Sequence, residues 1–237
     1  MRPIERGNCP NDSAGIPVVF KEYSRARRYL IDALGGYCSY CERKIEANLA
    51  VEHVLPKVLN PAVALEWSNF LLGCTNCNST KGAKPIVITE YFWPDVDNTF
   101  NVFLYDNSGI VKISSSLING NDKDKANNTI ELVGLGVLQP KTGTVAWQEA
   151  SDRRFEHRLQ AFIDSYNHSE TYRKSGVNTR KLLIPLIKTI VVSGGFWSIW
   201  MNKNKNFPEV QRIIINSYPG TNNSFFTHKK KKTHDHY

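Results

Sequence analysis

Apolar positions at helical spacing occupy the beginning and the last third of the chain. Near the beginning they predict an amphipathic helix over residues 18–34, which the pair Gly35-Gly36 would end. In the last third they predict four further helices, over residues 151–166, 177–193, 195–203 and 207–217. Ser151 is the expected cap of the first of these, and its expected apolar face consists of Phe155, Leu159, Phe162 and Ile163.

The middle of the chain follows a strand-like pattern instead. Short apolar runs predict strands at residues 86–88, 100–105 and 110–113. Asn107-Ser108-Gly109 predicts a hairpin turn between the last two, and the polar residues 119–128 predict a loop.

These patterns predict an α+β fold in four parts. Residues 37–84 are dense in Cys, Asn and Gly, which indicates a small unit held together by a metal ion. The expected parts are an N-terminal helix plus this metal-bound finger, a β-rich middle segment, an α-helical C-terminal region, and a basic, disordered tail, over residues 1–90, 91–150, 151–226 and 227–237.

Composition narrows the class of protein. Hydrophobic residues make up 41% of the 237 residues, which excludes a disordered chain. The longest apolar stretch, residues 182–201, contains Lys188 and the pair Gly194-Gly195. A lysine at the centre of a membrane helix costs about 2.5–3.5 kcal/mol, so two buried helices explain this stretch better than a membrane span. Because the first 13 residues are polar and resemble no secretion signal, we expect a soluble cytoplasmic protein.

The net charge of +8 favours a polyanionic partner. Its distribution weakens this indication, because residues 151–237 hold 15 basic residues against six acidic ones. Four of those 15 form the run Lys229-Lys230-Lys231-Lys232 in the expected disordered tail. The charge is therefore weak support for a nucleic-acid partner.

Four of the five cysteines form two Cys-x-x-Cys pairs, Cys38 with Cys41 and Cys74 with Cys77. Two such pairs can complete a tetrahedral set of thiolates with no open ligand position, so we predict one structural zinc ion. A redox motif would explain only one pair, and two disulfides do not suit a cytosolic chain. An iron ion remains an alternative on sulfur ligation alone, and Cys9 is predicted to be a free thiol.

Residues suited to hydrolysis lie between and just after the cysteine pairs. His53 is the only histidine in the first 156 residues, and a pKa of about 6.5 suits a base at neutral pH. Glu52 and Asn78 offer the hard oxygen ligands that Mg²⁺ and Mn²⁺ prefer. Neighbours in a regular strand point to opposite faces, so Glu52 and His53 can share a site only if the strand ends there. Pro56 makes such an irregular turn plausible.

The ordered set Glu-His-x-x-Pro, Asn69 and Cys-x-x-Cys-Asn-x-x-Lys-Gly resembles the motif of HNH endonucleases, a ββα-metal finger in a zinc-bound version. The resemblance implies that His53 is the general base and that Glu52 and Asn78 hold a catalytic Mg²⁺ or Mn²⁺. It also implies that Asn69 makes a loop hydrogen bond that holds His53, and that Lys81 contacts the scissile phosphate. The last motif position, usually His, is Asn in this chain, and Glu stands where Asp is more usual.

Over about the first 155 residues the chain resembles one HNH subfamily, the PtuB-like nucleases of Septu anti-phage defence, also found as retron effectors. The segments that carry this resemblance are residues 1–4, 37–42, 51–57, 67–72, 129–135 and 152–154. The subfamily implies a PtuA-like ATPase partner in a hetero-oligomer and, in retrons, a reverse transcriptase with its RNA–DNA product. We expect the segment after residue 90 to be the docking platform. The aromatic cluster Phe196, Trp197 and Trp200 fits either a core or a partner interface.

The sequence therefore predicts a metal-dependent endonuclease that cuts DNA as a defence effector. The same chemistry directed at RNA such as tRNA is an alternative, because this hydrolysis does not use the 2′-hydroxyl group. A second alternative is a zinc-stabilised adaptor that binds nucleic acid without cutting it. Such an adaptor would be expected to lack Glu52, His53 and Asn78, and all three are present.

Overall fold

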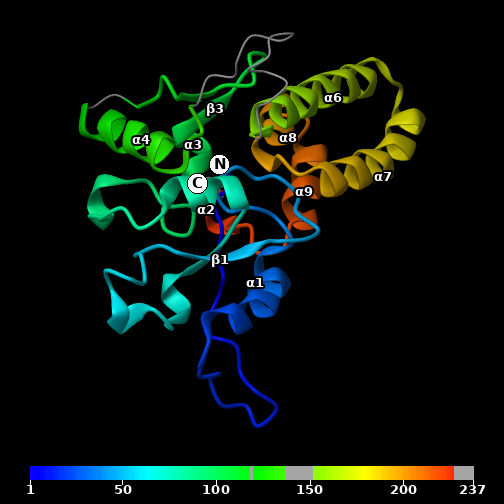
Figure 1. Ribbon diagram of the computed structural model, residues 1–237. Helices are drawn as coiled ribbons and strands as arrows, with labels where there is room; N and C mark the ends of the chain where they lie inside the picture. Colours follow the sequence, from blue (N-terminus) through cyan, green and yellow to red (C-terminus); the bar gives the residue numbers. More distant parts are fainter. Residues whose placement is uncertain (118–119, 137–151, 227–237) are drawn as a thin grey trace, which may run out of the picture.

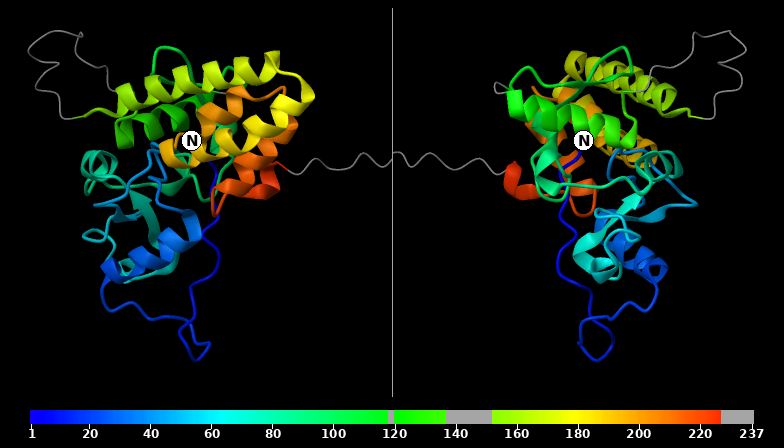
Figure 2. Two further views of the ribbon diagram at one scale, coloured as in Figure 1. Left: turned by 90° about the vertical axis from the view of Figure 1, so that its right-hand side faces the viewer. Right: turned by 60° about the vertical axis from the view of Figure 1, so that its left-hand side comes forward.

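The computed structural model describes residues 1–117, 120–136 and 152–226, and its fold mixes helices with two small sheets (Figure 1). Helix α1, Arg27–Leu34, and the finger of residues 37–84 lie toward one end of the molecule. The helices of the C-terminal region pack beside one another toward the other end (Figure 2).

The N-terminal helix is shorter than expected. A 3₁₀ turn, Tyr23–Ala26, leads into helix α1, Arg27–Leu34, which ends at Gly35 with a φ of 75° as predicted. Residues 18–22 are not helical, so the predicted start was wrong. The backbone N–H of Val18 bonds instead to the carbonyl of Pro10, and Phe20 is buried against Trp67.

The finger has the order strand, strand, helix. Strand β1, Ala50–His53, pairs antiparallel with β2, Phe70–Gly73, and helix α2, Thr75–Lys81, follows directly. Cys74 caps α2, because its sulfur accepts a hydrogen bond from the backbone N–H of Cys77. The predicted ββα arrangement is therefore present, and its second cysteine pair lies at the start of the helix.

The middle segment contains less strand than expected. Helix α3, Thr99–Val102, precedes strand β3, Phe103–Tyr105, which forms a hairpin with β4, Val111–Ile113. The predicted turn at this hairpin is confirmed, with Gly109 at a φ of 69°. The predicted strand at residues 86–88 is absent, and Ile88–Glu90 is a 3₁₀ turn.

The predicted loop at residues 119–128 was also wrong, because helix α4 spans Gly120–Val133. The first half of α4 is mostly polar and partly exposed. Its buried residues, Ala126, Thr129, Leu132 and Val133, recur at helical spacing and fall mostly beyond the polar run. The buried residues that hold this helix in place therefore begin at Ala126, within the segment whose polar composition predicted a loop.

The C-terminal helices are α6, Arg154–Lys174; α7, Val177–Gly194; α8, Trp197–Lys203; and α9, Pro208–Ser217. The last three agree with the sequence prediction to within two residues. Helix α6 extends eight residues further, and its expected apolar face is confirmed only in part, because Phe162 packs against buried apolar residues. Its buried residues are Arg154, Arg158, Ala161, Ser165, Ser169 and Tyr172, whereas Ile163 is 43% exposed. The expected cap, Ser151, lies outside the described residues.

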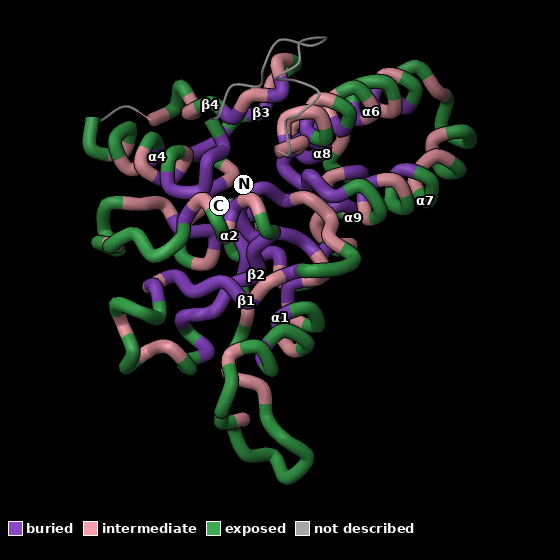
Figure 3. Tube along the Cα trace, viewed as in Figure 1, coloured by how far each residue is buried: buried purple, intermediate pink, exposed green. Residues whose placement is uncertain are grey.

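Two apolar cores hold the chain together (Figure 3). The larger joins α1, the finger and the middle segment, with Leu30, Phe70 and Phe103 fully buried. The smaller lies among the C-terminal helices around Trp197 and Trp200, which confirms the core alternative for these aromatic residues. No helix in the described ranges is long and apolar enough to cross a membrane.

Candidate functional site

A pocket of about 270 Å³ collects Glu52, His53, Asn78 and Lys81. Its walls are the end of β1, the turn that starts at Pro56, and the second half of α2 with the residues after it. Four of the five residues predicted for the hydrolytic site thus line one cavity. Asn69 is not among the lining residues.

Glu52 and His53 reach this pocket together because β1 ends at His53. In the ladder, Glu52 pairs with Leu71 and His53 with Phe70, and both side chains are buried. The strand end that the sequence required is therefore confirmed. Beyond it, the chain turns at Pro56, whose carbonyl accepts hydrogen bonds from the backbone N–H groups of Leu59 and Asn60.

The imidazole of His53 is fixed in one orientation. Its Nε2 atom lies 3.0 Å from the carbonyl oxygen of Ala64. A carbonyl can only accept, so Nε2 carries the proton and the lone pair of Nδ1 can take another one. The rings of Phe70 and Tyr23 contact the imidazole at centroid distances of 5.3 and 5.0 Å. Burial lowers the pKa of His53, and the nearby charges of Lys57 and Lys81 lower it further against the opposing bond to Ala64.

The hydrogen bonds of Asn69 go to the backbone of the loop beside His53 and not to the His53 side chain. Its Oδ1 accepts from the N–H of Leu55 at 2.7 Å, and its Nδ2 donates to the carbonyls of Leu55 and Val63 at 3.0 and 3.1 Å. These three bonds tie together both ends of the loop that follows β1. The next residue after Val63 is Ala64, which accepts from His53.

Lys81 faces inward in this structure. Its ammonium lies 2.9 Å from Oε1 of Glu52 and donates to the carbonyl of His53 at 2.6 Å. The side chain of Lys81 is only 1% exposed. Burial raises the pKa of the Glu52 carboxyl, and the charge of Lys81 opposes this shift. This geometry is at odds with the expected contact between Lys81 and a substrate phosphate, because its ammonium is already engaged.

Glu52 and Asn78 flank the same point in space. A Cβ atom added to Gly73 would lie 3.2 Å from Cβ of Glu52 and 3.5 Å from Cβ of Asn78. Oε1 of Glu52 is buried, and the ammonium of Lys81 at 2.9 Å is its one polar partner within the described part of the chain. A carboxylate oxygen can accept more than one partner, and with Asn78 lining the same pocket these residues fit a hard divalent cation.

The four paired cysteines are placed to bind one metal ion. Their sulfur atoms all lie within 4.8 Å of one another, and those of Cys41 and Cys74 are 3.7 Å apart. Zn–S bonds of about 2.3 Å in a tetrahedron place sulfur atoms about 3.8 Å apart, which this spacing matches. Burial raises the pKa of the Cys38 and Cys77 thiols, so four thiolates need a cation at their centre. Cys9 is half-buried and lies outside this cluster.

The sequence analysis missed a second contribution to this cluster, from helix α6. Arg154 donates from Nη1 to the sulfur of Cys77 at 3.1 Å and to the carbonyl of Val133 at 2.7 Å. Its Nη2 bonds to the carbonyl of Gly134 and to the carboxylate of Asp152. Two buried-face arginines four residues apart, at 154 and 158, are the pattern that could have indicated such a role.

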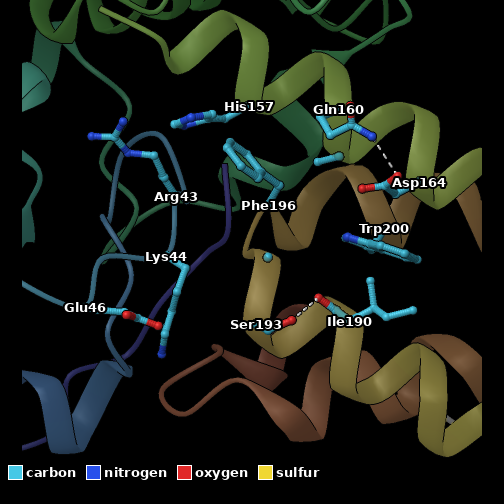
Figure 4. A pocket seen from close by; sticks show the side chains of 12 residues that line it. Arg43, Lys44, Glu46, His157, Gln160, Asp164, Ile190, Ser193, Phe196 and Trp200 are labelled. Carbon is cyan, nitrogen blue, oxygen red and sulfur yellow. Dashed lines mark hydrogen bonds between the residues drawn. The ribbon is translucent and has the colours of Figure 1, made fainter.

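A second cavity, of about 330 Å³, lies between the finger, α6 and α7 (Figure 4). Arg43, Lys44 and Glu46 face His157 and Trp200 across it. None of the site residues predicted from the sequence is among the described residues that line it. The predicted residues Glu52, His53, Asn78 and Lys81 therefore line the pocket at the end of β1 and not this cavity.

Comparison with known proteins agrees with this geometry. Residues 38–84 match the HNH endonuclease family. A curated relative, the "Septu protein PtuB" of Bacillus thuringiensis, is 28% identical over 112 residues, which cover 46% of this chain and 40% of the relative. The chain therefore matches less than half of the length of that relative. Both findings agree that the finger of this chain is similar to HNH endonucleases.

Proposed function

We propose that this protein, a nuclease of the HNH family, hydrolyses phosphodiester bonds in DNA with His53 as general base and with Mg²⁺ or Mn²⁺ held by Glu52 and Asn78. One observation carries the proposal. Nε2 of His53 is engaged by the carbonyl of Ala64 at 3.0 Å, in the same pocket as the buried carboxylate of Glu52. An imidazole with a fixed proton on one nitrogen beside a cation site is the arrangement that water activation requires.

The side chains divide the work between them. Nδ1 of His53 accepts the proton of the attacking water, and the carbonyl of Ala64 then stabilises the imidazolium through the Nε2 hydrogen bond. Asn69 keeps that carbonyl in place by fixing the loop at Val63. The divalent cation supplies positive charge that stabilises the phosphate and the leaving 3′-oxygen. The expected products therefore carry 5′-phosphates.

The ion held by the cysteine cluster is proposed to be zinc with a structural role. Four sulfur ligands leave no open position for water or substrate, so this ion is separate from the reaction. Its function is to hold the first knuckle and the start of α2 together around β1 and β2.

We propose that the nuclease acts in anti-phage defence with a PtuA-like ATPase. The name of the curated relative and the resemblance of residues 1–4 and 152–154 support this assignment. The docking platform is proposed to be the segment after residue 90, where Val177, Leu182 and Leu186 of α7 are each more than half exposed. A retron reverse transcriptase with its RNA–DNA product is a further candidate partner, and copurification with each candidate tests both.

The test compares wild-type protein with His53→Ala on supercoiled plasmid and on total tRNA, each with Mg²⁺ or Mn²⁺ and with the ATPase present. His157→Ala is the matched control, because His157 is an exposed histidine on α6, away from the pocket. We expect His53→Ala to lose about 10²–10⁴-fold in cutting rate while His157→Ala keeps wild-type activity. EDTA at a dose that spares the zinc should stop cutting.

Each other outcome selects an alternative. Cutting of tRNA but not plasmid would replace the DNA proposal by the RNA one. Equal cutting by wild type and His53→Ala would exclude His53 as the base. Binding without cutting by the wild type, with both metals and the partner present, would favour the non-catalytic adaptor.

A further inference from the structure

We propose that Lys57, held against the ring of Tyr23, binds the phosphodiester backbone of the nucleic-acid substrate beside His53. This inference rests on the proposed function and adds a substrate-binding residue to it. It also replaces the phosphate contact that the sequence analysis expected of Lys81.

Two lysines line the pocket, and they differ in what their charges face. Lys81 is buried and engaged by Glu52 and by the carbonyl of His53. Lys57 is exposed, and no acidic group among the described residues lies within ion-pair distance of it. The charge of Lys57 is therefore available to an incoming anion, whereas that of Lys81 already balances Glu52.

The position of Lys57 is fixed from two sides. Its backbone lies in the turn after Pro56, which is closed by hydrogen bonds from Leu59 and Asn60 to the carbonyl of Pro56. Its ammonium lies 3.8 Å from the centroid of the Tyr23 ring. An aromatic face attracts a cation electrostatically. Because no carboxylate is involved, the N–H groups of the ammonium stay available to donate hydrogen bonds to another anion.

Tyr23 links this ammonium to the base. The same ring that carries Lys57 contacts the imidazole of His53 at 5.0 Å between centroids, with the planes at 69°. Lys57 therefore stands beside His53, and its charge contributes to the lowered pKa of that histidine. A phosphate bound to Lys57 would therefore lie in the same pocket as the imidazole of His53.

The chemistry of the pocket selects a phosphodiester as the anion. The carboxylate of Glu52 faces Lys81, and His53 is neutral when it acts as base, so the charge of Lys57 adds to that of the proposed divalent cation and makes the pocket net positive. A phosphodiester carries one negative charge, and lysine binds phosphate as a point charge with three donors.

The experiment measures binding of a DNA duplex by Lys57→Gln in a His53→Ala background, so that no cutting is needed. Lys84→Gln is the matched control, because Lys84 is an exposed lysine close in sequence to Lys81 that does not line the pocket. Each phosphate contact contributes about 0.9 to the slope of log affinity against log salt. We expect Lys57→Gln to reduce this slope by about 0.9 and Lys57→Arg to restore it, with the slope of Lys84→Gln unchanged.

A second pair of variants tests the role of Tyr23. Tyr23→Phe keeps the ring face and should keep the salt slope, whereas Tyr23→Leu should reduce it as Lys57→Gln does. A wild-type slope for Lys57→Gln would overturn the proposal, as would equal losses for Lys57→Gln and Lys84→Gln. Neither result depends on cutting, so failure of this inference is distinguishable from failure of His53 as the base.

Discussion

The finger and the C-terminal helices reach a folded state by different means. The finger uses two four-residue strands and a seven-residue helix, which are too short to be stable alone. Its buried residues include Glu52, His53, Asn69 and four cysteines, each fixed by a specific partner. The C-terminal region uses helices of up to 21 residues around its own apolar core. The finger therefore adds donor chemistry at defined positions to the apolar core that it shares with α1 and the middle segment, whereas the C-terminal region depends mainly on buried apolar area.

These regions meet at the metal-binding knuckles and not at the hydrolytic pocket. Arg154 of α6 donates to the sulfur of Cys77, and the backbone N–H of Phe196 donates to the carbonyl of Glu42 at 3.0 Å. Ser198 of α8 donates to the carboxylate of Glu42. The helical region thus contacts the finger at the knuckles, and no described residue of the C-terminal helices lines the pocket at the end of β1.

Removal of one thiolate should give the largest effect and separate the two regions. Structural zinc contributes about 10–16 kcal/mol of binding free energy in finger peptides, so Cys74→Ser should lose the metal and unfold the finger. The C-terminal helices have their own core, so most of the helical circular-dichroism signal should remain. Elemental analysis and thermal unfolding check both expectations. Cys9→Ser is the control, and an equal metal content in Cys74→Ser and wild type would contradict the cysteine assignment.

The next largest effect is expected where the backbones of the two regions touch. Gly195 has a φ of 81°, and a Cβ atom there would lie 2.6 Å from the carbonyl oxygen of Glu42 and 2.7 Å from the nitrogen of Lys44. Both are backbone atoms, so Gly195→Ala should lower the free energy of unfolding by about 3 kcal/mol or more. Gly194→Ala is the control, because a Cβ at Gly194 meets open space. Urea titration measures the free energy of unfolding of each variant. Equal values for Gly195→Ala and Gly194→Ala would show that the backbone contact at Gly195 leaves room for a Cβ atom.

The same contrast explains which features the sequence could predict. The motif around His53 and the cysteine pairs have defined spacing, and the pocket and the cluster follow from it. Three C-terminal helices also followed from apolar periodicity. Helix α4 did not, because its polar first half hides an apolar face that begins at Ala126. The buried face of α6 did not, because Arg154 packs against sulfur and carbonyl groups that come from distant parts of the chain.

The inward orientation of Lys81 could not be predicted either. The sequence places Lys81 four residues after Cys77, where a basic side chain is ordinarily solvated. Only the pairing of β1 with β2, with α2 packed against them, brings its ammonium to Glu52 and the carbonyl of His53. Tertiary contacts thus place this ammonium inside the pocket, where the sequence pattern alone favours a solvated charge.

Arg154 is expected to give a smaller effect that sharpens the comparison. Arg154→Gln removes the donor to Cys77 and leaves the carbonyls of Val133 and Gly134 without this partner, at a cost of about 2 kcal/mol. A cysteine cluster carries negative charge even with zinc bound, so loss of the guanidinium should also speed zinc release to a chromogenic chelator. Arg153→Gln is the control, because Arg153 pairs with Glu156 at the surface. Equal release rates for the two variants would limit Arg154 to packing.

Ser198 should give the smallest effect, because it provides one hydrogen bond across the junction. Its hydroxyl donates to Oε1 of Glu42 at 2.5 Å, while its backbone N–H donates to Oε2 at 3.1 Å and is kept in any variant. Ser198→Ala should therefore lower the free energy of unfolding by about 1–2 kcal/mol, the range for a bond to a buried charged group. Ser193→Ala removes an exposed hydroxyl bonded only to the carbonyl of Ile190 and should stay near wild type. If Ser198→Ala changed the stability no more than Ser193→Ala, the junction would depend on backbone contacts such as that of Gly195 and not on the buried carboxylate.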